Sequence, residues 1–132
     1  MDARERVAAQ AQALVGVPFR LHGRSAATGV DCVGLVALAA KGAGLRVPPL
    51  PAYGLRGMGS AMAVQLLARC GLLSVDHAGA GDVLLVESGP MQLHLMIGTR
   101  DGIVHAHAGL GRVVLTPGPS PWPLLGAWRF QE

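Results

Sequence analysis

The order of the sequence patterns constrains the fold more than any other feature. Helical patterns come first, at residues 3–15, 31–43 and 60–70, and short apolar or alternating runs follow. These runs are residues 82–87, 93–98, 103–107, 112–115 and 125–130. Short runs separated by turn residues are typical of antiparallel strands. The sequence therefore predicts an α+β class, with N-terminal helices packed on a C-terminal antiparallel sheet, in a single domain over residues 1–132.

Polar residues at the helix starts support these boundaries. Asp2 with Glu5 fits a capping box, and Asp31 and Ser60 are placed to cap the second and third helices. The second helix is apolar nearly all round, which predicts a central position. Residues 46–57 contain three prolines and are predicted to lack regular structure.

Composition and charge exclude several classes of function. The net charge of +3 is weak, and without a basic block or aromatic ladder it gives nucleic-acid binding no support. No run approaches the roughly 18 apolar residues of a membrane span. The charged start lacks the features of a secretory signal, so we expect synthesis in the cytoplasm and another route to any site of action outside.

The two cysteines have different surroundings. Cys32 follows a glycine-containing loop and lies in the first turn of the helix 31–43, where unpaired N–H groups can lower the thiol pKa and bind an oxyanion. We therefore expect Cys32 to be a nucleophile with a lowered pKa. The alternative is a buried cysteine that only packs. Cys70 ends the helix 60–70, near the negative pole, and is predicted to serve packing.

A nucleophilic cysteine needs a base and a group that orients the base, and three histidines in the strand region could supply them. Residues 99–102 form a predicted turn, so the strand 103–107 folds back on the strand of His94. One register places His94 opposite His105, and the other, with residues 98 and 103 paired, places it opposite His107. In both registers all three rings share one face, so one can accept the thiol proton while another fixes its tautomer.

The histidines could also serve as metal ligands or as substrate contacts. His94, His105 and His107 could bind zinc with Cys32 or an aspartate, but no established ligand motif is present, and we predict no metal and no cofactor. His22 lies in the loop before Cys32 and is a candidate substrate contact.

Five segments carry a recognisable pattern in a fixed order. Residues 17–25 (VPFRLHGRS) and 31–36 (DCVGLV) lie around Cys32, and residues 81–85 (GDVLL), 94–98 (HLMIG) and 103–106 (IVHA) lie in the strand region. In this order they resemble the nucleophile region and three strands of the NlpC-type family of papain-like cysteine peptidases, which are cell-wall hydrolases. The resemblance covers roughly residues 5–115.

The resemblance implies a papain-like α+β fold and a site. Cys32 would be the nucleophile, His94 the general base and His105 the orienting residue, with His107 as the alternative. Secondary or substrate-binding candidates are Phe19, His22, Asp31 and His107, and Phe19 stands where the family has a tyrosine. The implied reaction is hydrolysis of an amide bond in peptidoglycan stem peptides, commonly between D-glutamate and a diamino acid, without a cofactor.

The short chain and its ending, residues 126–130 (GAWRF), resemble family members encoded with phage tails and gene-transfer particles. This resemblance implies delivery to the cell wall with a particle, and phage-tail or particle proteins as partners beside the peptidoglycan substrate. Two alternatives remain open at this point. One is a structural tail or assembly module that keeps the fold with weak catalysis. The other is a thiol amidase or acyl hydrolase with a different substrate.

Overall fold

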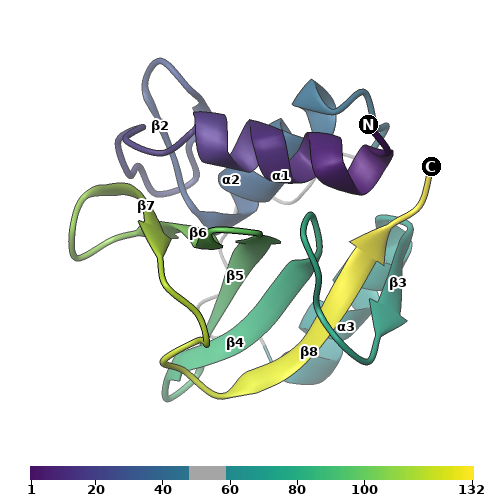
Figure 1. Cartoon of the computed structure of the whole chain (residues 1–132). Coiled ribbons are helices and arrows are strands. Elements are labelled where there is room, and N and C mark those ends of the chain that lie inside the picture. Colours follow the sequence, from purple (N-terminus) through teal and green to yellow (C-terminus); the bar gives the residue numbers. More distant parts are fainter. Residues whose placement is uncertain (48–58) are drawn as a thin grey trace.

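The computed structural model describes residues 1–47 and 59–132, and within these ranges helices pack against a six-stranded antiparallel sheet (Figure 1). The helices are α1 (Ala3–Ala13), α2 (Cys32–Gly42) and α3 (Ser60–Arg69). The strands are β1 (Arg24–Ser25), β2 (Gly29–Val30), β3 (Leu72–Val75), β4 (Val83–Gly89), β5 (Gln92–Thr99), β6 (Gly102–His107), β7 (Arg112–Thr116) and β8 (Leu124–Phe130). The sheet order is β3-β8-β4-β5-β6-β7, and β1 pairs only with β2. The predicted α+β class is confirmed.

Side-chain caps explain where the first two helices begin. Asp2 accepts a hydrogen bond from the amide of Glu5, at 2.9 Å, and Asp31 accepts one from the amide of Gly34, also at 2.9 Å. The prediction for α3 was wrong, because its N-cap is Gly59 and makes no side-chain cap bond. Gly59 has the extended backbone of a cap, whereas Ser60 is already helical.

The predicted strands are all present, and the structure adds three that the sequence did not indicate. Strand β3 pairs with β8, with Leu72 opposite Phe130, so its partner lies nearly sixty residues further along the chain. Strands β1 and β2 form a small hairpin within residues 20–30, which were predicted to be loop. Most of the proline-containing segment 46–57 lies outside the described residues.

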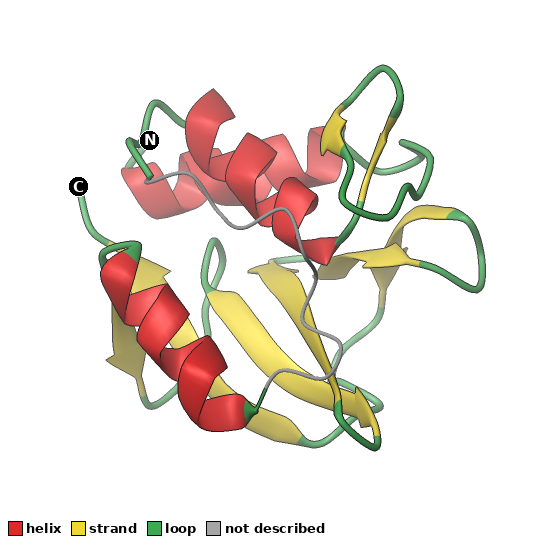
Figure 2. Cartoon of the chain, turned by 180° about the vertical axis from the view of Figure 1, so that it is seen from behind, coloured by secondary structure: helices red, strands yellow, loops and turns green. Residues whose placement is uncertain are grey.

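The main core lies between the helices and one face of the sheet. Helices α1 and α2 lie side by side over this face, and α3 covers the end formed by β3 and β8 (Figures 1 and 2). A smaller cluster on the opposite face packs against Trp122 and contains Leu84, Val86, Met96 and Ile103. Because both faces of β5 are packed, its side chains are held in fixed positions. None of the helices in the described ranges is long and apolar enough to cross a membrane.

Candidate active site

Cys32 is the first residue of α2, and Asp31 fixes this end of the helix. One carboxylate oxygen of Asp31 accepts bonds from the Gly34 amide, at 2.9 Å, and from the Arg24 guanidinium, at 2.7 Å. The other accepts the backbone amide of His22, at 2.9 Å. Asp31 is buried, so these bonds replace its hydration and tie the preceding loop to the helix start.

Two glycines let the loop lie directly on the first turn of α2. A Cβ on Gly34 would collide with the carbonyl oxygen of Gly23, and a Cβ on Gly23 would collide with the carbonyl oxygen of Gly29. The backbone amide of Phe19 donates to Gly111, at 2.8 Å, which joins the loop to the turn after β6. These contacts leave little freedom in the backbone around Cys32.

The histidines form the opposite side of the site. His94 of β5 and His105 of β6 are joined by a hydrogen bond of 3.1 Å between Nε2 and Nδ1. The strands adopt the register that pairs Gly98 with Ile103, but the ladder ends at Ile97 and Val104. The prediction that this register sets His94 opposite His107 was therefore wrong, because the pairing stops before it reaches His94.

His107 is the last residue of β6, where it pairs with Arg112 of β7. Its Nδ1 accepts the backbone amide of Leu110, at 3.0 Å, and its ring lies 5.5 Å from the ring of His105. All three histidines line one pocket, as the alternation of the strands predicted, and only His105 bonds to His94 within the described residues. Of the two candidates for the third residue, the geometry favours His105.

Two residues at the site were not identified from the sequence. Trp122 makes edge-on ring contacts with both His94 and His105, each at 5.6 Å between centroids. Thr116 lies with its hydroxyl 3.0 Å from Nε2 of His105. Trp122 lies between two prolines in the segment before β8, and this unusual setting could have marked it as a site residue. Thr116 ends a strand, and no sequence feature marks it as a site residue.

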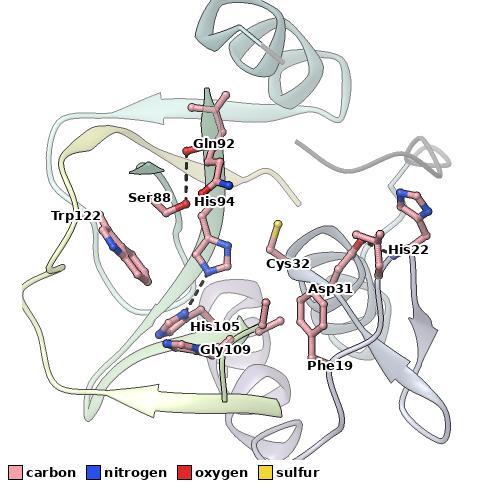
Figure 3. Close-up of a pocket in the computed structure, with 15 residues that line it drawn as sticks. Phe19, His22, Asp31, Cys32, Ser88, Gln92, His94, His105, Gly109 and Trp122 are labelled. Carbon is pink, nitrogen blue, oxygen red and sulfur yellow. Dashed lines mark hydrogen bonds between the residues drawn. The ribbon is translucent and has the colours of Figure 1, made fainter. Parts of the chain in front are cut away.

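A pocket of about 740 Å³ lies between the cysteine and the histidines. Cys32 and His94 face each other across it, and the ring nitrogen of His94 that does not bond to His105 is on the side nearer Cys32 (Figure 3). The structure describes no hydrogen bond between the thiol and this ring. The lining residues are Phe19, Leu21, His22, Asp31, Cys32, Ser88, Gln92, Leu93, His94, His105, Ala106, His107, Ala108, Gly109 and Trp122.

The four secondary candidates, Phe19, His22, Asp31 and His107, therefore all border the pocket, but they lie at different distances from the thiol. Phe19 lies beside Cys32, and Asp31 lies behind it at the helix start (Figure 3). His22 lies beyond Asp31 and further from the thiol, and its backbone has a positive φ of 60°. The structure thus brings Cys32, His94 and His105 to one place and leaves His22 at the edge.

Burial dominates the electrostatics of the site. It raises the pKa of Cys32 to about 11, although a hydrogen bond from the Leu95 backbone acts in the opposite direction and lowers it. The prediction of a lowered pKa was wrong, because desolvation outweighs the N–H groups of the helix start. Burial, followed by the charges of neighbouring histidines, lowers the pKa of His94 to about 4, and that of His105 is also lowered to about 4. At pH 7 all three groups are therefore uncharged.

The rival metal hypothesis finds no support in the geometry. Across residues 1–47 and 59–132, no group of three histidine, cysteine, aspartate or glutamate side chains is arranged to hold a metal ion. The imidazole nitrogens of His105 instead bond to His94 and Thr116.

Several solved structures resemble the fold of this chain. The P60 domain of M. avium subspecies paratuberculosis antigen MAP1204 is 23% identical, with a TM-score of 0.65, and the match covers 97% of this chain and 93% of that one. The fold is that of the NlpC/P60 domains. The papain-like fold expected from the resemblance is thereby confirmed.

Two further NlpC/P60 structures are informative. The peptidoglycan hydrolase RipB from Mycobacterium tuberculosis is 23% identical over 98% of this chain, with a TM-score of 0.64, and this chain spans 65% of its length. RipD from the same organism, described as a non-catalytic NlpC/p60 domain protein adapted to peptidoglycan binding, is 19% identical. Its TM-score is 0.61, and the match covers 98% of this chain and 97% of RipD. No family model and no curated protein matches the sequence.

Proposed function

We propose that the protein is a cysteine hydrolase that cleaves amide bonds in peptidoglycan stem peptides. Cys32 is the nucleophile, His94 the general base and His105 the residue that orients His94. The observation that carries the proposal is the 3.1 Å hydrogen bond between Nε2 of His94 and Nδ1 of His105, which leaves Nδ1 of His94 for the thiol across the pocket. The NlpC/P60 fold, shared with the peptidoglycan hydrolase RipB, supports the choice of substrate.

The reaction has two stages, acylation and hydrolysis of the acyl-enzyme, and each needs one proton transfer to His94 and one from it. Nδ1 of His94 takes the proton of the Cys32 thiol as the sulfur attacks the scissile carbonyl carbon. The same proton then passes to the leaving amine as the C–N bond breaks, which leaves a thioester on Cys32. Water, deprotonated by His94, hydrolyses this thioester and restores the thiol.

The charge states of Cys32 and His94 determine when the thiol proton moves. With the pKa of Cys32 raised to about 11 and that of His94 lowered to about 4, the resting pair is a neutral thiol and a neutral imidazole. The thiol proton therefore moves during the attack, and the enzyme does not store a thiolate. General-base catalysis of this kind needs Nδ1 of His94 to be unprotonated, which the low pKa favours above pH 4.

The start of α2 supplies the groups that bind the oxyanion. The first amides of a helix have no partner within the helix, and Cys32 and Val33 are the first two residues of α2. These two N–H groups are the proposed donors to the oxyanion. Phe19 supplies an apolar wall beside the thiol where the family has a tyrosine hydroxyl.

We further propose the bond and the route of delivery. The stem-peptide bond between D-glutamate and a diamino acid is the proposed target, and a phage or gene-transfer particle is the proposed carrier to the cell wall. The resemblance of residues 17–25, 31–36, 94–98 and 103–106 supports the first, and that of residues 126–130 the second.

A second function has support of its own. The pocket can bind a stem peptide without cleaving it, as a module of a particle or of the wall. The raised pKa of Cys32 and the missing hydrogen bond between its thiol and His94 favour this alternative within the described residues. RipD, a non-catalytic domain with the same fold, is its precedent.

One experiment separates the two functions. The purified protein and its Cys32→Ala variant are incubated with isolated peptidoglycan and with soluble stem peptides, and released fragments are identified by mass spectrometry. Hydrolysis that disappears in the variant supports the hydrolase and identifies the bond. Saturable binding of both proteins without cleavage supports the binding module.

A further inference from the structure

The hydrogen bonding of His105 continues beyond His94 to a residue on the next strand. Oγ1 of Thr116 lies 3.0 Å from Nε2 of His105, and Nδ1 of His105 lies 3.1 Å from Nε2 of His94. Thr116 pairs with Ile103 across the β6–β7 ladder, so it is a diagonal neighbour of His105 on the same face of the sheet. Three side chains on three adjacent strands thus form a continuous chain that leads away from the pocket.

This chain of bonds can run in two directions. A neutral imidazole has one N–H donor and one acceptor nitrogen. In the first direction, His94 donates from Nε2 to His105, and His105 donates from Nε2 to the hydroxyl of Thr116. In the second, Thr116 donates to His105, His105 donates from Nδ1 to His94, and His94 carries its proton on Nδ1.

Only the first direction leaves a base in front of Cys32. With its proton on Nε2, His94 presents the Nδ1 lone pair to the thiol (Figure 3). With its proton on Nδ1, the ring presents an N–H and cannot accept the thiol proton. The tautomer of His105 therefore decides whether His94 can act.

We propose that Thr116 is a positioning residue whose hydroxyl accepts the Nε2–H of His105 and thereby reserves Nδ1 of His105 for the proton of His94. The consequence for catalysis rests on the proposed function of Cys32 and His94. The hydrogen-bond direction itself does not depend on it. Since His105 is only 3% exposed, its Nε2–H has little access to water as a substitute acceptor.

Loss of the Thr116 hydroxyl should reverse the direction of the hydrogen bond between His105 and His94. A buried N–H without an acceptor is costly, so the proton of His105 would move to Nδ1, where Nε2 of His94 can accept it. The proton of His94 would then occupy Nδ1, on the side of Cys32. The number of protons is unchanged, but the base is blocked.

A matched pair of substitutions separates this role from packing. Thr116→Val keeps the shape of the side chain and removes the hydroxyl, whereas Thr116→Ser keeps the hydroxyl and removes the methyl group. On stem peptides we expect Thr116→Val to lower kcat about five- to tenfold with little change in KM, the size of one lost hydrogen bond. Thr116→Ser should stay within about twofold of the wild type. A packing role predicts the reverse, with Thr116→Ser the weaker enzyme, and that result would overturn the proposal.

A second readout needs no substrate. Long-range ¹H–¹⁵N NMR spectra report which ring nitrogen of each histidine carries the proton. We expect His105 to be the Nε2–H tautomer in the wild type and in Thr116→Ser, and to shift toward Nδ1–H in Thr116→Val. A wild-type His105 with its proton on Nδ1 refutes the proposal even if no variant folds. If the tautomers behave as expected while the wild type hydrolyses no stem peptide, the proposed function fails and the positioning role of Thr116 stands.

Discussion

The two cysteines lie at opposite poles of two helices, and the contrast between them is instructive. Cys32 begins α2, is buried, and shares a pocket with His94 and His105. Cys70 is the C-cap of α3, is half buried, and borders a different cavity, where no histidine lies among the described lining residues. Both are free thiols.

Burial raises the pKa of both thiols, so the pKa alone does not distinguish them. The difference lies in the neighbours. Cys32 faces an oriented imidazole and the unpaired amides of a helix start, whereas Cys70 faces the C-terminal end of a helix. The proposal that Cys32 is the nucleophile therefore rests on its neighbours and not on a lowered pKa.

The sharpest test of this contrast replaces each cysteine in turn. Cys32→Ala should abolish peptide hydrolysis, a loss of more than about 10³-fold, because no other group can form the thioester. Cys70→Ala should leave the rate within about twofold, since Cys70 only packs against the core. Rates are measured on purified stem peptides, with circular dichroism to verify folding. Equal losses in the two variants would contradict the contrast.

Single substitutions can likewise distinguish the proposed orienting role of His105 from the role of its neighbour His107. His105→Ala should lower kcat about 10- to 100-fold, because His94 loses the bond that fixes its tautomer and orientation. His107→Ala should cost less than about threefold, since its Nδ1 bonds to the Leu110 amide rather than to His94. Steady-state kinetics on both variants provide the measurement. A larger loss for His107→Ala would assign the role to His107 instead.

The two helix ends also differ in how closely the chain packs around them. Gly34→Ala should destabilise the protein by about 3 kcal/mol or more, because its Cβ would strike the backbone of Gly23. Gly71→Ala, next to Cys70, should cost only about 1–2 kcal/mol, since its φ of +82° is strained for alanine but the surrounding space is open. Urea unfolding of both variants gives the comparison. Equal losses would show that the loop does not depend on Gly34.

The last predicted difference is a pH dependence of stability that the two histidines of the site confer and Cys70 does not. His94 and His105 have pKa values lowered to about 4 in the folded protein, so between about pH 6.5 and pH 4 the unfolded chain binds more protons. Stability should therefore be full above pH 6.5 and fall as the pH drops toward 4, by up to about 1.4 kcal/mol per pH unit for each histidine.

Urea titrations from pH 7 to pH 4 measure this slope. The double variant His94→Gln, His105→Gln should flatten it, whereas Cys70→Ala should leave it unchanged. An equally steep slope in the double variant would show that other groups carry the acid sensitivity.

Much of the arrangement could be predicted because local signals carried it. Asp2 and Asp31 were identified as caps because a side-chain cap depends on neighbours a few residues away. The shared face of His94, His105 and His107 followed from the alternation of strands, which register changes of two residues preserve. The position of Cys32 in the first turn of α2 followed from the cap at Asp31.

What could not be predicted depends on distant contacts. Strand β3 exists because β8, at the end of the chain, pairs with it. Trp122 and Thr116 reach the histidines from other segments, and no local pattern indicates these contacts. The raised pKa of Cys32 reflects how deeply the sheet and helices bury it, which the helix start alone does not reveal.

The central claim is that Cys32 attacks the substrate with His94 as its base. Its most direct test is rapid acid quenching of the protein with a stem peptide, followed by mass spectrometry of the intact chain and of its peptides. The account predicts an acyl adduct on Cys32, none on Cys70, and no adduct in His94→Gln. Hydrolysis without an adduct on Cys32, or an adduct that forms equally well in His94→Gln, would contradict it.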